Sequence, residues 1–169
     1  MTDQVLRLVS ATEADTRAIG AALAGVLEPG DVVGLTGDLG AGKTRLVQGA
    51  ATALGVEGPV VSPTFMLVRE YDGAVVDVHH VDAYRLEGPG ELEDLGLDSV
   101  LDPDTVVFVE WADRVERVLP PDWLEVRLEV GDDEVRAVGV LSHGPSWAHR
   151  AAALRAVLKP FLVPSWVIP

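Results

Sequence analysis

The chain has 169 residues, which fits one domain, so we expect residues 1–169 to form a single domain. It contains no cysteine, which excludes disulfide frameworks and thiolate metal sites. Its formal net charge of −14 repels phosphate backbones, which argues against a protein that clamps nucleic acid by itself. No apolar stretch approaches the roughly 20 residues of a membrane span and no leader pattern is visible, so we expect a cytoplasmic protein with no membrane partner.

The first part of the chain alternates strand and helix patterns. Residues 5–9 alternate apolar and polar side chains, which predicts a strand. A helix should follow, capped by Thr12 with Asp15 three residues on, and ended by Pro29-Gly30. Residues 31–36 predict a short buried strand. The buried stripe of the helix is predicted to contain Ile19, Ala22, Leu23, Val26 and Leu27.

The segment 37–44, Gly-Asp-Leu-Gly-Ala-Gly-Lys-Thr, fills the phosphate-loop pattern G-x-x-x-x-G-K-[ST]. It stands between the buried strand and an amphipathic helix that should end at Gly55. The glycines let backbone N–H groups point at phosphates, and the helix adds the positive end of its dipole. Lys43 is expected to reach the β- and γ-phosphates, and Thr44 to ligate Mg²⁺. The predicted nucleotide-binding residues are Asp38, Leu39, Gly40, Ala41, Gly42, Lys43 and Thr44.

The middle of the chain predicts a hairpin and a central strand. Strands at 65–71 and 75–81 flank an Asp-Gly pair, which is a strong hairpin signal. Residues 90–95 predict a short acidic helix. The continuous apolar run 105–109 suits a strand that is buried on both faces. Residues 112–119 predict a short helix that ends at two prolines.

The last part predicts an antiparallel pair and a helix. Strands at 123–130 and 135–141 alternate apolar with polar residues around a turn that contains two aspartates. A helix with an Ala, Leu and Val stripe should cover 147–158. The tail from 160 to 169 has no regular period.

Two acidic residues are candidates for phosphate chemistry. Glu110 directly follows the apolar run, where an ionised side chain is costly unless it faces a cation or solvent. It is predicted to hold Mg²⁺, with a solvated strand-end glutamate as the alternative. Asp82 ends the preceding strand and could orient the attacking water or bind Mg²⁺ through water. The alternative makes its segment, His79 to Arg85, a hydrogen-bonded turn.

Three further predictions surround these acids. Thr64, in Ser-Pro-Thr, could supply a hydroxyl to Mg²⁺ or to the γ-phosphate, or could simply start a strand. Trp111 could be a core residue or a packing lid, or it could have a functional role. His79 and His80 are neighbours on a strand, so they should point to opposite faces and cannot easily bind one metal together.

The nucleotide is predicted to be ATP by elimination. A guanine-reading Asn-Lys-x-Asp motif is absent, and the one Asp-x-x-Gly precedes the phosphate loop. The sequence contains no adenine motif, and Glu13 and Arg136 are only guesses for that contact.

Five motifs taken together resemble one family. They are Gly-Asp-Leu-Gly-Ala-Gly-Lys-Thr at 37–44, Ser-Pro-Thr-Phe at 62–65, His-Val-Asp-Ala-Tyr-Arg-Leu at 80–86, Glu-Leu-Glu-Asp-Leu-Gly at 91–96 and Val-Glu-Trp at 109–111. Their order and spacing resemble the TsaE (YjeE-like) P-loop ATPases of bacterial tRNA threonylcarbamoyladenosine synthesis. The resemblance extends from about Leu8 to Leu141 and leaves the last helix and tail, 142–169, without a counterpart.

The resemblance implies a small three-layer P-loop α/β domain with a mixed, mostly parallel sheet and an antiparallel hairpin. It implies an ATPase that is slow alone, needs Mg²⁺ and works on a TsaB–TsaD heterodimer, which modifies adenosine 37 of tRNA. Contact with tRNA would be indirect, through that complex. Carried onto this chain, Lys43, Asp82 and Glu110 are catalytic and Thr44 and Glu110 hold the metal. Thr64 and Trp111 would belong to the surrounding functional surface.

A small-molecule kinase is the alternative function, because P-loop kinases share this size and fold. Such kinases usually close a basic lid over ATP, whereas the arginines of this chain are scattered singly. A third possibility is a nucleotide-gated binding module, which would differ only in whether Asp82 and Glu110 support turnover.

Overall fold

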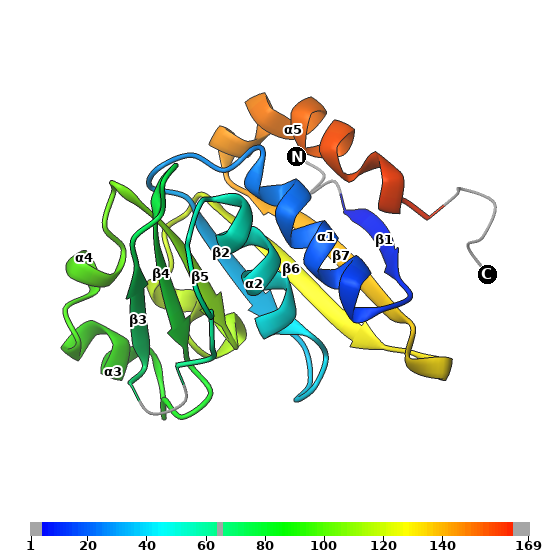
Figure 1. Cartoon of the computed structure of the whole chain (residues 1–169). Coiled ribbons are helices and arrows are strands. Elements are labelled where there is room, and N and C mark those ends of the chain that lie inside the picture. Colours follow the sequence, from blue (N-terminus) through cyan, green and yellow to red (C-terminus); the bar gives the residue numbers. More distant parts are fainter. Residues whose placement is uncertain (1–4, 64–65, 164–169) are drawn as a thin grey trace.

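The computed structural model describes residues 5–63 and 66–163. The strands are β1 (Leu6–Ser10), β2 (Val32–Thr36), β3 (Val68–Tyr71), β4 (Asp77–Asp82), β5 (Thr105–Glu110), β6 (Trp123–Val130) and β7 (Arg136–His143). The α-helices are α1 (Glu13–Ala24), α2 (Lys43–Ala53), α3 (Pro89–Asp94), α4 (Leu97–Val100) and α5 (Pro145–Leu158). Single 3₁₀ turns are η1 (Ala112–Arg114), η2 (Glu116–Val118), η3 (Asp132–Glu134) and η4 (Lys159–Phe161). Strands and helices alternate from β1 to α2, and the later strands include the β3–β4 and β6–β7 antiparallel pairs (Figure 1).

The described strands form one seven-stranded sheet in the order β1-β7-β6-β2-β5-β4-β3. The neighbours β4, β5, β2 and β6 pair in parallel at the centre. The pairs β3–β4, β6–β7 and β1–β7 are antiparallel and lie to either side. The mixed α/β fold is thus confirmed. Antiparallel pairings equal the parallel ones in number, where a mostly parallel sheet was expected, because β1 joins the sheet at the free edge of β7.

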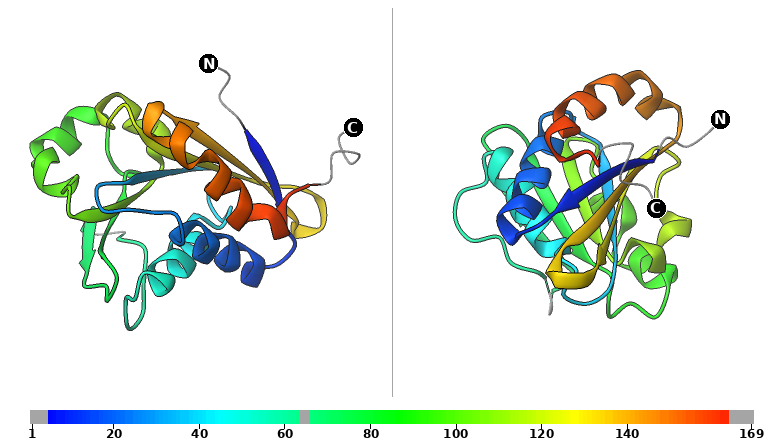
Figure 2. Two further views of the ribbon diagram at one scale, coloured as in Figure 1. Left: turned by 90° about the horizontal axis from the view of Figure 1, so that it is seen from above. Right: turned by 90° about the vertical axis from the view of Figure 1, so that its right-hand side faces the viewer.

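The larger of two hydrophobic cores lies between one face of the sheet and the helices α1, α2 and α5 (Figure 2). The predicted stripe of α1 is confirmed for Ile19 and Leu23, which are fully buried, and for Ala22, which packs beside them. The helix ends at Ala24, earlier than the predicted end at Pro29-Gly30, so Val26 and Leu27 pack against this core from the segment after the helix. Thr12 caps this helix as expected, and its side chain accepts a hydrogen bond from the Asp15 backbone N–H. Gly49 lets α2 approach α1 closely, because a Cβ there would overlap the Arg17 carbonyl oxygen.

The smaller core covers the opposite face of the sheet and makes the fold three-layered. It is built from α3, the end of α4 and the 3₁₀ turns η1 and η2, and it contains Leu92, Val100 and Val115. The expectation of one helix over 112–119 is wrong, because this segment forms η1 and η2. The two turns are separated at Val115, whose φ of −128° is not helical and whose side chain is buried in this core. Eight residues before two prolines are too few to outweigh that packing.

The last helix, α5, packs through Trp147, Leu154 and Leu158 into the larger core. Arg150 then joins it to the start of β2, because its guanidinium donates two hydrogen bonds of 2.6 and 2.7 Å to the Asp31 carboxylate. The segment 142–169, for which the sequence predicted no family counterpart, is therefore a structural part of the fold as far as residue 163. Among the helices of residues 5–63 and 66–163, none has the length and apolar character needed to cross a membrane.

Candidate active site

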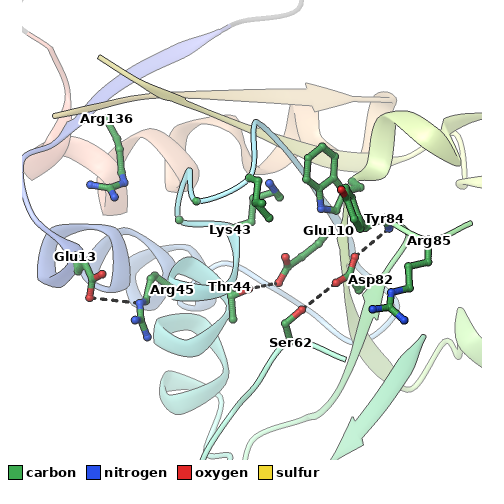
Figure 3. A pocket seen from close by; sticks show the side chains of 14 residues that line it. Glu13, Lys43, Thr44, Arg45, Ser62, Asp82, Tyr84, Arg85, Glu110 and Arg136 are labelled. Carbon is green, nitrogen blue, oxygen red and sulfur yellow. Dashed lines mark hydrogen bonds and ion pairs between the residues drawn. The ribbon is translucent and has the colours of Figure 1, made fainter. Parts of the chain in front are cut away.

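The parallel strands bring the predicted site residues to the same end of the sheet, because the carboxyl ends of β2, β4 and β5 all lie there. The β4–β5 register sets Asp82 directly opposite Glu110. The loop between β2 and α2 curls over the same end, and together they border a cleft of about 530 Å³ (Figure 3). The predicted residues that line this cleft are Leu39, Gly40, Gly42, Lys43, Thr44, Asp82, Glu110 and Trp111.

The phosphate loop has a backbone that only glycines adopt easily. Gly37 has a φ of 140°, and a Cβ on it would overlap the Leu128 carbonyl oxygen of β6. Gly42, with a φ of 108°, is the cap from which α2 begins. Arg136 of β7 holds the loop from the other side, since its Nε donates a 2.9 Å hydrogen bond to the Ala41 carbonyl. Asp38 and Ala41 belong to the loop but are not among the residues that line the cleft.

Lys43 is folded into the loop and is only 4% exposed. Its Nζ donates to the Gly37 carbonyl at 2.6 Å and to the Asp38 carbonyl at 2.9 Å, and it lies 4.0 Å from the centre of the Trp111 ring. Burial lowers the pKa of the Lys43 ammonium from its ordinary value, while the nearby carboxylates of the cleft oppose that change. One of the three ammonium donors is left for a ligand in the cleft.

Glu110 links the loop to the sheet. Its Oε1 accepts a 2.7 Å hydrogen bond from the Thr44 hydroxyl and lies 2.8 Å from Nε2 of His80. The side chain is 4% exposed, which differs from the alternative of a solvated strand-end glutamate. These two contacts hold the carboxylate beside the first residues of α2, where a cation shared with a phosphate would lie.

Asp82 is held by two different elements. Its Oδ2 accepts a 2.9 Å hydrogen bond from the Ser62 hydroxyl, and its Oδ1 accepts one of 3.0 Å from the Tyr84 backbone N–H (Figure 3). The alternative of a hydrogen-bonded turn with Tyr84 in the core is only partly present, because residues 79–82 belong to β4 and Tyr84 is exposed in the turn that follows. The Asp82 carboxylate also lines the cleft. Thr64, two residues after Ser62, lies outside the described residues.

Trp111 lines the cleft next to Lys43, and its backbone is left-handed with a φ of 59°. Its ring packs against Tyr84 with centroids 4.9 Å apart, and the guanidinium of Arg114 lies 5.9 Å from the Trp111 ring. Trp111 is partly buried beside the smaller core and also faces the Lys43 ammonium group, so its packing is shown while its functional role stays a prediction. The left-handed backbone turns the chain from β5 into η1.

The described residues contain no group of three or more acidic or histidine side chains that could hold a metal by themselves. A metal that shares few protein ligands with phosphates and water fits this arrangement, and Mg²⁺ commonly binds in that way. His79 and His80 diverge as expected, because Nδ1 of His79 lies 2.9 Å from the Val100 carbonyl whereas His80 contacts Glu110.

Sequence reasoning missed three contacts of the site. Ser62 bonds to Asp82, His80 bonds to Glu110, and Arg136 bonds to the loop where a base contact had been guessed. Glu13, the other guess for a base contact, forms an ion pair of 3.3 Å with Arg45 in the cleft lining. The only signal for His80 is its place two residues before Asp82 on one strand, which puts both side chains on one face.

Comparison with known proteins identifies the family. The model of the family described as "Threonylcarbamoyl adenosine biosynthesis protein TsaE" matches residues 10–138. The chain belongs to the TsaE family. TsaE of Streptomyces coelicolor is 47% identical over 139 residues, which cover 78% of this chain and 93% of that protein. TsaE of Bacillus subtilis is 45% identical over 121 residues, covering 71% of this chain and 75% of its relative.

A solved structure agrees with the TsaE assignment. The crystal structure of YdiB from Bacillus subtilis superimposes with a TM-score of 0.80 and 31% sequence identity. The superposition covers 92% of this chain and 97% of YdiB. It therefore extends beyond residues 10–138, which are the part matched by the TsaE family model.

The contact between the loop and β6 yields a stability prediction. Gly37→Ala should lower the free energy of unfolding by about 3 kcal/mol, because the added methyl group overlaps the Leu128 carbonyl oxygen in a left-handed backbone. Gly58→Ala is the matched control, since its φ is 87° but no atom lies within 4 Å of the added Cβ. In urea unfolding, Gly58→Ala should lower the free energy of unfolding by only about 1 kcal/mol. Equal losses in the two variants would show that the loop is not held against β6.

Proposed function

We propose that this TsaE protein binds ATP with Mg²⁺ and hydrolyses it, slowly alone and faster on a TsaB–TsaD heterodimer, during modification of tRNA adenosine 37. The relatives carry names that assign them to tRNA threonylcarbamoyladenosine biosynthesis, which supports this role over that of a small-molecule kinase. The observation that carries the ATPase proposal is the 2.7 Å hydrogen bond from the Thr44 hydroxyl to Glu110. It joins a phosphate loop to an acid at the end of the adjacent parallel strand.

The loop fits a triphosphate. The helix α2 is 11 residues long and begins at Lys43, so its first N–H groups and its dipole favour an anion in the cleft. Lys43 has a donor left for the β- and γ-phosphates. Thr44 and Glu110 would hold Mg²⁺, which neutralises charge on the phosphates when it is bound. The Thr44 hydroxyl can do this while it still donates to Glu110, because its oxygen keeps lone pairs for the metal.

Asp82 is the residue that we assign to water activation. It lies across from Glu110 in the strand register, and the hydrogen bonds from Ser62 and Tyr84 fix both of its oxygens. A carboxylate held in this way orients a water molecule and accepts its proton as the water oxygen bonds to the γ-phosphorus. The bond from that phosphorus to the β–γ bridging oxygen then breaks, and the products are ADP and inorganic phosphate.

The rim of the cleft supports the action of a protein partner. Leu39 is 81% exposed and Tyr84 is 44% exposed, although both are hydrophobic and both line the cleft. Exposed apolar side chains around a ligand site fit a protein surface that closes over it. The net charge of −14 repels nucleic acid, so contact with tRNA is assigned to the partners.

Steady-state ATP hydrolysis, with and without a TsaB–TsaD heterodimer from a closely related bacterium, tests the proposal. We expect a low rate for the chain alone and a rise of at least tenfold with the heterodimer. Glu110→Ala is the blank and should stay flat in both conditions. ATP binding with an unchanged rate on addition of the heterodimer would refute partner activation, and a panel of small acceptors would then test the kinase alternative.

Two substitutions separate binding from turnover. Lys43→Ala should weaken ATP binding about tenfold to a hundredfold, because it removes a charged donor to the phosphates. Asp82→Ala should leave the ATP dissociation constant within about twofold and lower kcat at least a hundredfold. Calorimetric binding and phosphate release measure the two effects, with the exposed Asp94→Ala of α3 as the control. Full turnover by the Asp82 variant would remove that residue from the mechanism.

A further inference from the structure

His80 is a buried side chain to which the proposed mechanism gives no role. It lies in the middle of β4 and is fully buried. Its Nε2 is 2.8 Å from Oε1 of Glu110, the same oxygen that accepts the Thr44 hydrogen bond. Its Nδ1 is buried without a hydrogen-bond partner among the residues that the structure describes. Because the two ring nitrogens have different surroundings, these surroundings decide which of the two carries a proton.

The carboxylate partner and the unpaired nitrogen together select one form of the imidazole ring. An ionised carboxylate only accepts hydrogen bonds, so Nε2 must carry a proton to bond with Glu110. A proton on Nδ1 would be a buried donor without an acceptor, which costs more than a lone pair without a donor. Of the two neutral tautomers of the ring, these conditions favour the one with its proton on Nε2. His80 is therefore a fixed donor aimed at Glu110.

The strand register explains how the donor reaches the acid. His80 pairs with Phe108, and Asp82 pairs with Glu110, in the parallel β4–β5 ladder. His80 and Asp82 are two residues apart, so both side chains leave the same face of β4. The strand that supplies the catalytic Asp82 thus also supplies a support for Glu110 from within the core. Thr44 supports the same carboxylate from α2.

We propose that His80 is a positioning residue that holds Oε1 of Glu110, so that the remaining carboxylate oxygen is available to Mg²⁺ or its water shell. This role rests on the proposed Mg²⁺–ATP site. A glutamate at a strand end has three rotatable side-chain bonds, and a single hydroxyl donor leaves the carboxylate free to turn about that contact. A second donor from a buried ring restricts it further. Partners of this kind behind a metal ligand typically affect metal affinity about tenfold to a hundredfold.

The test compares two substitutions that differ in the donor. His80→Gln keeps an N–H group that can reach Glu110, whereas His80→Leu removes the donor and keeps an apolar side chain. The readout is the affinity for a fluorescent ATP analogue in Mg²⁺ and in EDTA. We expect His80→Leu to lower the Mg²⁺ enhancement of affinity about tenfold with little change in EDTA. His80→Gln should restore the enhancement to within about twofold of the unsubstituted chain.

His79→Leu is the matched control, because it is a buried histidine on the same strand whose ring contacts the Val100 carbonyl on the opposite face. It should leave the Mg²⁺ enhancement unchanged. Equal loss in the His79 and His80 leucine variants, or equal loss with and without Mg²⁺, would overturn the proposal in favour of a role in packing alone. An undiminished enhancement in His80→Leu would overturn it as well.

Nitrogen-15 NMR of the nucleotide-free chain supplies a readout that needs neither turnover nor a folded variant. We expect His80 signals that show a proton on Nε2. A ring with its only proton on Nδ1 would overturn the proposal, because Nε2 could then donate nothing to Glu110. Failure of the proposed function is a separate outcome, since a chain without ATPase activity on its partner can still show the predicted tautomer and Mg²⁺ enhancement.

Discussion

The hydrogen bond between Thr44 and Glu110 is the contact on which the site depends. It joins the first turn of α2 to the end of β5 through two residues that are 66 positions apart in the chain. The parallel pairing of β2 with β5 makes the contact possible, because both strands end at the same edge. Two neighbouring strands also contact this pair: Arg136 of β7 bonds to the phosphate loop, and His80 of β4 contacts Glu110.

The charged side chains buried at this end of the sheet favour a bound cation. Lys43, Asp82 and Glu110 are each less than 9% exposed, and an ionised group at such a place is costly unless it is paired. Among these three buried groups, one ammonium faces two carboxylates, so one buried negative charge is left that a cation in the cleft would balance. This arrangement supports the proposed binding of Mg²⁺ beside Glu110.

The features that could be predicted from the sequence are those determined by residues close together in the chain. The loop, its flanking strand and helix, and Glu110 after an apolar run all follow from patterns within a few residues. The contact of His80 with Glu110 could not be predicted, because it depends on the register between β4 and β5. The break at Val115 depends on a core formed by distant segments, and the share of antiparallel pairing depends on the position of β1. The periodicity of the sequence carries no information on the packing at Val115 or on the position of β1 in the sheet.

A crystal structure of the chain with Mg²⁺ and a non-hydrolysable ATP analogue tests the central claim most directly. The account predicts a metal at about 2.0–2.1 Å from the Thr44 hydroxyl oxygen, with Glu110 reaching it directly or through one water molecule. The Thr44 hydroxyl should still donate to Glu110, and Lys43 should contact the β- or γ-phosphate. A metal or triphosphate bound away from Thr44 and Glu110 would contradict the account.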